Sequence, residues 1–519
     1  MERRAAAGDA EQFKDEVVIL TKGAGLTGPW AVGGYPVGFV VSMVIARIVG
    51  AAVFGAVALG VGLVTLVQIL STVGMDRGVL KYVSFFYGKR DLASLRSVVR
   101  QATAVCVVLS VAVAAAYWCF GRLALPSVFP DIGGIGYVAT VFFVLGIFPS
   151  LLLLYGNAVT GVQKPQRAQF ANSLLRPLVQ LVALLLLSLL LSDLAALTWA
   201  TVLAYAAAAS FVVASFSRQW PRVEASGSRA TTAADRFGLW ELFQFSLPLT
   251  LVPVLNFGGQ QADILLVGHY LQAADVGVYA AARRTAAIAL VPLFAFGGIT
   301  AATISKLFAR NHQHAIRRLY EFVAKWVFVG SAVLFVILVV AAEDLLSLFG
   351  SEFVRGANAL RVLAAGQLVN AAVGPSGNTL LMMGRERVVL LNSTVAAALG
   401  IFLGLLLIPR YEILGAAAAV AITLCAVNLL SVVELGALLG VYPGPVTAYA
   451  KRLMAVALCA AITFGLRLLV DGAVAGLLLT SACSLAVLPL LVVLGEGFST
   501  EDSVIVKAVL GKARALGGR

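Results

Sequence analysis

The feature that most constrains this chain is a series of apolar stretches that follow one another over nearly the whole sequence. A helix rises 1.5 Å per residue, so roughly 20 apolar residues are needed to cross the hydrocarbon core of a bilayer. Hydrophobic residues make up 61% of the chain and charged residues only 12%, whereas soluble domains average about 45–50% and about 25%. The sequence therefore predicts an all-α membrane protein with about fourteen transmembrane helices.

Only short connections separate the expected spans, and no hydrophilic stretch is long enough to form a soluble domain. The longest one, residues 217–240, is rich in Ser, Thr, Gly and Arg, so we expect a flexible cytoplasmic linker there. The spans themselves are expected at residues 30–49, 53–73, 102–120, 136–156, 177–191, 196–216, 242–268, 276–303, 322–342, 358–381, 390–408, 413–436, 453–470 and 473–495.

Basic residues are distributed unevenly around these spans. If both termini are placed in the cytoplasm, 30 of the 38 Lys and Arg residues fall in the N-terminal arm, the cytoplasmic connections and the C-terminal tail. This is the positive-inside asymmetry, and it predicts a multi-pass protein of the cytoplasmic (inner) membrane with both termini in the cytoplasm. The net charge of +13 is then a topogenic signal. Its expected partners are membrane lipids and not nucleic acid.

The cysteines give no sign of a metal or redox site. All five lie inside the expected spans, at Cys106, Cys119, Cys425, Cys459 and Cys483. Their spacing matches neither a metal site nor a disulfide framework, so we interpret them as small apolar residues. We therefore expect no metal and no cofactor.

The two halves of the chain resemble each other. Three pairs of short segments match at a nearly constant offset of 220 to 222 residues: 51–55 with 273–277, Gly156-Asn157 with Gly377-Asn378, and Asn172 with Asn392. Each half holds six spans, so both halves enter the membrane from the same side. This predicts two parallel six-helix lobes related by a pseudo-two-fold axis along the membrane normal. Two facing lobes would enclose the central cavity of an alternating-access carrier.

The expected organisation follows from this repeat. Two additional helices come after the second lobe, outside the repeat. The predicted parts are an N-terminal lobe at 1–216, the linker at 217–240, a C-terminal lobe at 241–436, the extra helix pair at 437–495 and a cytoplasmic tail at 496–519.

Several loose motifs, taken in their order and spacing, carry a resemblance to a known family. They are Ala46-Arg47-Ile48-Val49-Gly50 followed by Phe54-Gly55, Gly74-Met75-Asp76-Arg77-Gly78, Asp263 to Gly268 followed by Val276-Gly277-Val278-Tyr279, Gly377-Asn378, Gly384, Asn392, Ile408 to Tyr411, and Gly415-Ala416-Ala417. With these the chain resembles the polysaccharide-transport branch of the multidrug/oligosaccharidyl-lipid/polysaccharide exporter superfamily.

The resemblance implies a function. Members of this branch are similar to flippases that carry lipid-linked oligosaccharides across the membrane for O-antigen, capsule or other surface glycans. The expected partners are a polyprenyl-pyrophosphate-linked oligosaccharide, membrane lipids and other polysaccharide-assembly proteins, and a monomer is expected. We expect no enzyme, because the outer connections are short and no Asp-x-Asp motif occurs. Two rivals of the same fold stay open: a multidrug-extrusion antiporter and a lipid II flippase. The antiporters commonly use a carboxylate in the first helices, whereas residues 30–49 contain no Asp or Glu.

The few charges inside the spans are the candidate functional residues, because a charge in the bilayer costs at least roughly 2.5–3.5 kcal/mol. Asp263 is expected in the seventh span, and Arg283 and Arg284 in the eighth. The arginines suit a substrate pyrophosphate, because the planar guanidinium binds phosphate oxygens bidentately. Asp263 would compete for them or couple transport to protons. The alternative is a structural salt bridge between Asp263 and Arg283 or Arg284.

Four further residues complete the predicted site. Arg47 ends the first span, and the repeat places His269 at the corresponding position. We interpret Arg47 as a substrate-binding cation and His269 as a coupling group, with snorkelling to the interface as the alternative. Asn256 and Gln260 lie on the seventh span. Their amides either bind sugar hydroxyls or hold helices together.

Overall fold

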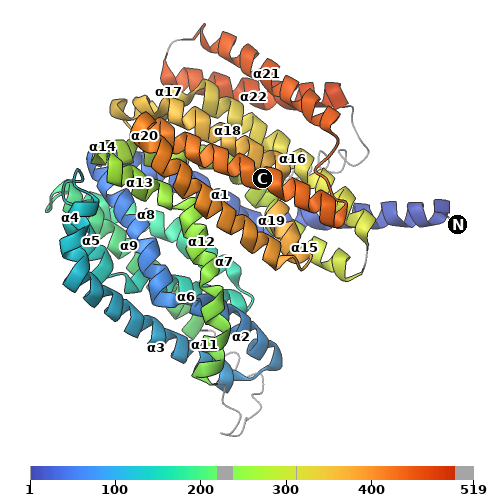
Figure 1. Ribbon diagram of the computed structural model, residues 1–519. Helices are drawn as coiled ribbons and strands as arrows, with labels where there is room; N and C mark the ends of the chain where they lie inside the picture. The colour runs from blue at the N-terminus through green and yellow to red at the C-terminus, as the bar shows by residue number, and fades with distance from the viewer. Residues whose placement is uncertain (1, 219–237, 311, 471, 497–519) are drawn as a thin grey trace, which may run out of the picture. The chain divides into compact units, whose positions relative to one another are not determined.

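The computed structural model describes residues 2–218, 238–310, 312–470 and 472–496, and within these ranges the chain is helical and contains no β-strand (Figure 1). The side chains of residues 2–33, 35, 260, 298, 299, 302 and 496 are outside the description. The helices confirm the predicted all-α membrane fold class. Most of the predicted linker and of the predicted tail lies outside the described residues.

The chain divides into two compact units. One contains residues 34–281 and 396–416, and the other contains the described parts of 1–33, 282–395 and 417–519. The two units are defined by which residues contact one another, whereas the predicted lobes are defined by the order of the spans along the chain. The division into lobes at 1–216 and 241–436 therefore stays a prediction, and each unit is described by itself.

The first unit is built around contacts among its early helices. Helix α9 packs against both α6 and α8, and α2 packs against α3, α6 and α11. α1 enters this unit at residue 34, and α14 leaves it after residue 281. The helices are α1 (Glu2–Thr72), α2 (Met75–Lys89), α3 (Leu92–Ala116), α4 (Arg122–Val128), α5 (Ile135–Val144), α6 (Ile147–Gly161), α7 (Pro165–Phe170), α8 (Arg176–Leu187), α9 (Asp193–Ser217), α11 (Leu239–Leu249), α12 (Leu251–Gln260), α13 (Ala262–Tyr270), α14 (Ala273–Ala286) and the middle of α20 (Glu386–Leu439).

The second unit is organised by its longest uninterrupted helix, α16 (Gln313–Val340). Helix α16 packs against α15, α18, α21 and α22, and α15 also packs against α19. The other helices are α15 (Val291–Ala309), α17 (Ala342–Ser347), α18 (Ala357–Val373), α19 (Ser376–Met382), α21 (Val446–Arg467) and α22 (Ala473–Glu496).

Many of these helices have the length and composition to cross a membrane. Within the described residues there are 10 candidate spans, and α5 with α6, bent by 46°, makes an eleventh. Two candidates are interrupted: α1 at Gly50, where φ is 76°, and α20 at Glu412, where φ is 53°. Each of these two therefore covers two predicted spans. The structure is that of a multi-pass membrane protein, and the count of fourteen spans stays a prediction.

The candidate for the fifth span has different bounds from those that the sequence predicted. It was expected at 177–191, but the apolar helical run that can cross the membrane is Pro165–Leu187. Helix α7, a π-helical turn at Ala171–Leu175 and α8 follow one another without a gap in this run. The predicted span 177–191 overlaps this run but begins after Arg176, because Arg176 was counted with the cytoplasmic basic residues.

Two close contacts in the first unit reproduce the sequence repeat. A Cβ added to Gly34 would overlap the side chain of Ser173, and a Cβ added to Gly258 would lie 3.0 Å from the Cβ of Ala397. The corresponding residues of the two contacts differ by 224 positions and not by the 220 to 222 of the matched segments, so the two contacts correspond in the order of the spans and not residue by residue. Each packs the first helix of a half against the fifth helix of the same half. Small residues permit such close approach, which strengthens helix association inside a bilayer.

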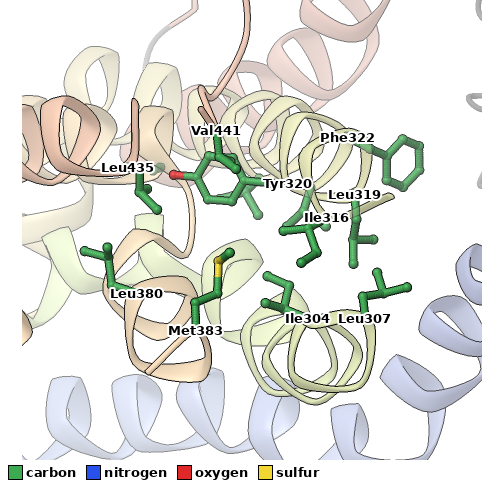
Figure 2. Packing of buried hydrophobic residues seen from close by; sticks show 13 residues of the cluster. Ile304, Leu307, Ile316, Leu319, Tyr320, Phe322, Leu380, Met383, Leu435 and Val441 are labelled. Atoms are coloured by element: carbon green, nitrogen blue, oxygen red, sulfur yellow. The ribbon is translucent and has the colours of Figure 1, made fainter. Parts of the chain in front are cut away.

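The second unit contains a dense apolar core between α15, α16, α19 and the end of α20. Figure 2 shows Ile304 and Leu307 of α15 opposite Ile316 and Leu319 of α16, and all four side chains are at most 1% exposed. Tyr320 is fully buried beside them. Since lipid tails are as apolar as leucine, close van der Waals packing holds such helices together in a membrane more than the hydrophobic effect does.

The predicted tenth span corresponds to α18 and α19, which are separated by a break at Gly374-Pro375. Helix α18 ends at Val373, Gly374 adopts φ 76°, and α19 begins after Pro375. A break leaves carbonyl groups without helical donors, and these must be satisfied inside a membrane. The hydroxyl of Tyr320 donates to the carbonyl of Val373 at 2.6 Å, and that of Tyr449 donates to Ala372 at 2.6 Å. Two tyrosines from neighbouring helices therefore stabilise the broken span.

The two C-terminal helices, α21 and α22, lie side by side and pack against α16 (Figure 1). Arg467 at the end of α21 forms two hydrogen bonds of 2.8 Å with the Asp344 carboxylate, from Nε to Oδ2 and from Nη2 to Oδ1. A bidentate pair of this kind is among the stronger charge interactions in proteins. It ties the last helix pair to α17.

Candidate functional site

The second span and the start of α14 cross at very close range within the first unit. A Cβ on Gly55 would overlap the carbonyl oxygen of Ala273 and lie 2.5 Å from the amide nitrogen of Gly277. A Cβ on Gly277 would overlap the carbonyl oxygen of Ala51. Only glycine lets the two backbones approach this closely.

This crossing is reciprocal. Ala51 corresponds to Ala273 and Gly55 to Gly277, each at the offset of 222 residues that the sequence repeat predicts. Each glycine contacts the alanine of the other half, so exchanging the two halves leaves the contact unchanged. The repeat is therefore present in the packing as well as in the sequence.

Asp263 lies at the start of α13, the helix that precedes α14 in the chain. The hydroxyl of Tyr279 in α14 donates a hydrogen bond of 2.6 Å to Oδ2 of Asp263. Tyr279 is fully buried, and Asp263 is half-buried. These are the first and last residues of one of the family-like motifs, so the motif encodes a hydrogen bond that joins α13 to α14.

The arginines predicted to bind substrate fall in different units. Arg47 is exposed and lies three residues before the break at Gly50. Arg283 is half-buried and Arg284 exposed, both near the end of α14. Arg47 and Asp263 belong to the first unit and the two arginines of α14 to the second. Their convergence, and a pair between Asp263 and Arg283 or Arg284, stay predictions.

His269 does not lie deep in a span. It is exposed at the end of α13, and its Nδ1 lies 2.6 Å from the carbonyl oxygen of Val128. Its ring meets Tyr270 edge to face, with centroids 4.7 Å apart. The contact joins the end of α13 to the end of α4, and the assignment of His269 as a coupling group stays a prediction.

The two amides predicted to bind sugar lie on α12. Asn256 is half-buried, two residues before the close packing of Gly258 on Ala397. The backbone of Gln260 ends α12, but its side chain lies outside the described residues. Both therefore stay predictions as substrate contacts.

Two motifs of the first unit meet at a buried carboxylate. Asp76, in the first turn of α2, is 5% exposed, and Nδ2 of Asn157 in α6 lies 3.4 Å from its Oδ2. Arg77 Nε lies 3.6 Å from the same oxygen. Burial raises the pKa of the Asp76 carboxyl, and the neighbouring Arg77 opposes this shift. The sequence placed Asp76 in a turn motif but gave no sign that Asn157 was its partner.

Arg176 is the intramembrane charge that sequence reasoning missed. It lies at the centre of the span Pro165–Leu187 and is half-buried. Its Nη1 donates to the hydroxyl of Tyr205 in α9 at 3.1 Å, and its guanidinium lies 5.1 Å from the centre of that ring. A wider hydropathy window, tolerant of one central charge, would have found it.

Comparison with known protein families shows to which family the chain belongs. The family described as polysaccharide biosynthesis protein matches residues 20–308, which is more than half of the sequence. The chain belongs to the polysaccharide biosynthesis protein family. The MatE family also matches, over residues 248–406. A comparison with curated protein sequences finds no match.

Solved structures share the fold of this polysaccharide biosynthesis family member. A lipid II flippase, MurJ, in an inward closed conformation aligns with a TM-score of 0.70 at 11% identity, covering 90% of this chain and 98% of its own. An inward-facing multidrug resistance MATE family transporter of the MOP superfamily aligns with a TM-score of 0.63 at 15% identity, covering 77% and 92%. A MOP superfamily transporter from Pyrococcus furiosus gives 0.57 at 15% identity, covering 81% and 94%. At these identities the likeness establishes the fold alone.

The polysaccharide biosynthesis match contains the main features of the site. Residues 20–308 include the Gly55–Gly277 crossing, the Asp263–Tyr279 hydrogen bond and Arg176. The predicted membership in the polysaccharide branch of this exporter superfamily is therefore confirmed.

Proposed function

We propose that this protein is an alternating-access flippase that translocates a polyprenyl-pyrophosphate-linked oligosaccharide across the cytoplasmic membrane during surface polysaccharide assembly. The observation that carries the proposal is the match of residues 20–308 to the polysaccharide biosynthesis protein family. The fold shared with transporters supports it. The protein would perform no covalent chemistry on its substrate and would keep both termini in the cytoplasm.

The reciprocal crossing supports the alternating-access part of the proposal. Gly55 and Gly277 bring the two repeats into backbone contact at one end of their helices. A passage that opens at this end requires the contact between Ala51–Gly55 and Ala273–Gly277 to separate. Closely packed interfaces switch between discrete arrangements and do not deform continuously, which suits a two-state carrier.

The distribution of charge supports an anionic substrate. Arg47, Arg283 and Arg284 would bind the pyrophosphate, and Asn256 and Gln260 would bind sugar hydroxyls. Arginine keeps its charge at any physiological pH and offers a planar fork to phosphate oxygens. Asp263 and His269 would couple the movement to protons.

Transport in reconstituted vesicles tests the proposal. The purified protein is placed in liposomes that contain a polyprenyl pyrophosphate bearing a fluorescent disaccharide, and an impermeant quencher reports the fraction in the outer leaflet. We expect the protein to accelerate exchange between leaflets over empty liposomes. The double variant Arg283→Gln/Arg284→Gln should slow it at least tenfold, whereas Arg385→Gln, in the connection between α19 and α20, should leave it within twofold.

Two rival functions are measured in the same system. The MatE match over residues 248–406 favours a multidrug antiporter, and the MurJ alignment over 90% of the chain favours a lipid II flippase. Proton-driven uptake of a cationic dye without flipping of the lipid-linked disaccharide would replace the proposal by the first. Exchange of lipid II in preference to the disaccharide lipid would replace it by the second. A protein that accelerates none of these processes would not be a transporter of this kind.

A further inference from the structure

Arg176 occupies the most unfavourable position for a charge in its span. The span runs from Pro165 to Leu187, so Arg176 is 11 residues from either end. At 1.5 Å per residue this is roughly 16 Å, about half the thickness of the hydrocarbon core. A side chain at this depth cannot easily reach either interface. An arginine there costs at least roughly 2.5–3.5 kcal/mol, and intramembrane charges usually mark a substrate or ion pathway.

No carboxylate offsets this charge within the described part of the chain. Among the described residues the Arg176 guanidinium contacts Tyr205, whose hydroxyl lies 3.1 Å from Nη1 and whose ring centre is 5.1 Å from the guanidinium carbon. Tyr205 is a neutral partner and uses only part of a guanidinium that has five N–H donors. The remaining donors favour an anionic ligand.

The backbone is distorted at the same point. A π-helical turn at Ala171–Leu175 ends at Arg176, whose N–H bonds to the carbonyl of Ala171, five residues earlier. Pro177 follows, and a proline has no N–H to donate to the carbonyl of Ser173 four residues before it. Single π-helical turns inside α-helices occur frequently at functional sites. The turn ends at Arg176, and the carbonyl group that Pro177 cannot bond makes the middle of the span more polar.

Further polar side chains follow the same helix. Gln169 and Ser173 precede Arg176 along this helical run, and Gln180 follows it by four residues. Gln169 Nε2 donates to Ser173 Oγ at 2.9 Å, and Gln180 Nε2 donates to Thr201 Oγ1 at 2.9 Å. Amides and hydroxyls around a guanidinium are the groups that bind the hydroxyl and acidic groups of a glycan.

We propose that Arg176, with Gln180 and Tyr205, forms an anion-binding site in the middle of the fifth span that holds an acidic group of the transported lipid-linked glycan. The identity of the ligand rests on the proposed function. Two groups of such a substrate have the required chemistry: a phosphate of the pyrophosphate and the carboxylate of an acidic sugar. Both present paired oxygens to the guanidinium fork.

The position of the site gives it a specific role. Arg47 ends its predicted span, whereas Arg176 lies at the centre of the span Pro165–Leu187, as Arg283 and Arg284 do in the span Ala273–Gly297. A substrate anion that leaves one interface must be stabilised before it reaches the other. Arg176 supplies that stabilisation at the point where the cost of burying a charge is greatest.

Equilibrium binding tests this site without measuring transport. Wild-type protein in lipid nanodiscs is titrated with inorganic pyrophosphate, glucuronate and glucose, and binding is followed by calorimetry. We expect saturable binding of at least one anion and a loss of affinity of at least tenfold in Arg176→Gln. Arg176→Lys should lose less, because it keeps the charge but not the fork. Loss of pyrophosphate binding alone assigns the site to the lipid pyrophosphate, and loss of glucuronate binding alone assigns it to an acidic sugar.

Arg167→Gln is the matched control. Arg167 lies on the same helical run, nine residues earlier near its end, and its Nη1 lies 3.4 Å from the carbonyl oxygen of Ser215. Its removal should change either affinity by less than twofold, and the unfolding temperature of Arg176→Gln should not fall below that of the wild type. The inference is wrong if the wild type binds neither anion, or if Arg176→Gln binds both like the wild type. It is also wrong if Arg167→Gln loses as much affinity. Failure to flip the disaccharide lipid, with anion binding at Arg176 intact, would overturn the proposed function and leave this site standing.

Discussion

Tyr279 and Asp263 are joined by a hydrogen bond of 2.6 Å from the tyrosine hydroxyl to the carboxylate. The tyrosine is fully buried, and the two residues are 16 apart in the sequence, on α14 and α13. The bond therefore fixes the hairpin between these helices. The same hairpin carries Gly277 into its contact with Ala51, so the hydrogen bond and the crossing stabilise one another.

Tyr279→Phe should destabilise the protein. The substitution removes the donor and leaves the half-buried carboxylate of Asp263 without it, and hydrogen bonds to charged groups contribute about 1.5–3 kcal/mol. We expect a lower unfolding temperature in detergent, measured by intrinsic fluorescence. Tyr270→Phe is the control, since Tyr270 is exposed and packs only edge to face on His269. Equal unfolding temperatures of both variants would contradict the structural importance of the bond.

The variant Asp263→Asn tests the predicted role of Asp263 in proton coupling separately from its role in the stability of the protein. The amide oxygen of asparagine still accepts from Tyr279, so the unfolding temperature should stay close to that of the wild type. The charge is lost, and the pH dependence of flipping in liposomes should be lost with it. Flipping that keeps the pH dependence of the wild type would show that Asp263 is structural and that coupling must be sought elsewhere.

Gly55→Ala and Gly277→Ala should have similar effects. Each adds a methyl group that overlaps a carbonyl oxygen of the other repeat, and overpacking costs about 1–3 kcal/mol. Both variants should lower the unfolding temperature and change the flipping rate. Gly136→Ala is the control in the same unit, because a Cβ there meets open space. A strong effect at one glycine and none at the other would contradict the reciprocal geometry.

Arg467→Met should loosen the C-terminal helix pair. Its bond with Asp344 is bidentate, and the two side chains are only 23% and 13% exposed, so the loss should be about 1.5–3 kcal/mol. Glu343→Gln is the control, because it breaks the Arg361–Glu343 ion pair, a single contact of 3.1 Å with side chains 34% and 64% exposed, and leaves the bonds of Arg361 to Val339 and Asn358 in place. Exposed pairs contribute at most about 1 kcal/mol. Two measurements compare Arg467→Met with the control: the unfolding temperature, and the protease sensitivity of the connection between α21 and α22.

The stability of the protein should depend on the protonation of Asp76. Burial raises the pKa of its carboxyl above 3.8 in the folded protein, so the folded state holds the proton more tightly than the unfolded state. The carboxyl therefore favours folding most at pH below 3.8, and this contribution is lost as the pH rises through the raised folded-state pKa.

Asp76→Asn imitates the protonated carboxyl at every pH. Its unfolding temperature should exceed that of the wild type by a few degrees at pH 7, and the gap should narrow as the pH is lowered toward 4. Asp131→Asn, at an exposed position, should show no such pH-dependent gap. A constant gap for Asp76→Asn from pH 7 to 4 would mean that the buried carboxyl is not the titrating group.

The helical fold was predictable because hydrophobicity alone marks membrane spans. Every predicted span overlaps a helix, and the family and the repeat were both visible in short motifs. The error at the fifth span has the same origin: Arg176 was assumed to end an apolar stretch, because a charge inside one is costly. The structure shows that the helix continues on both sides of Arg176.

The contacts between distant residues were not predictable. Asp344 and Arg467 are 123 residues apart in the sequence, and nothing in local periodicity pairs them. The same is true of Asp76 with Asn157. Helical periodicity defines which face a residue occupies, whereas the partner across that face depends on how the helices are arranged. The Asp263–Tyr279 bond is intermediate, because one motif contains both residues but a motif does not reveal its hydrogen bonds.

The reciprocal crossing of Gly55 with Ala273 and of Gly277 with Ala51 bears on the origin of the chain. A contact that is unchanged when its two sides are exchanged is the hallmark of a two-fold homodimer interface. In an ancestor of half this length, one glycine and one alanine would have formed the whole contact between two identical subunits. Duplication and fusion of the gene would then have kept that dimer contact within a single polypeptide and freed each copy to diverge, as the appearance of Arg176 in only one of the halves illustrates.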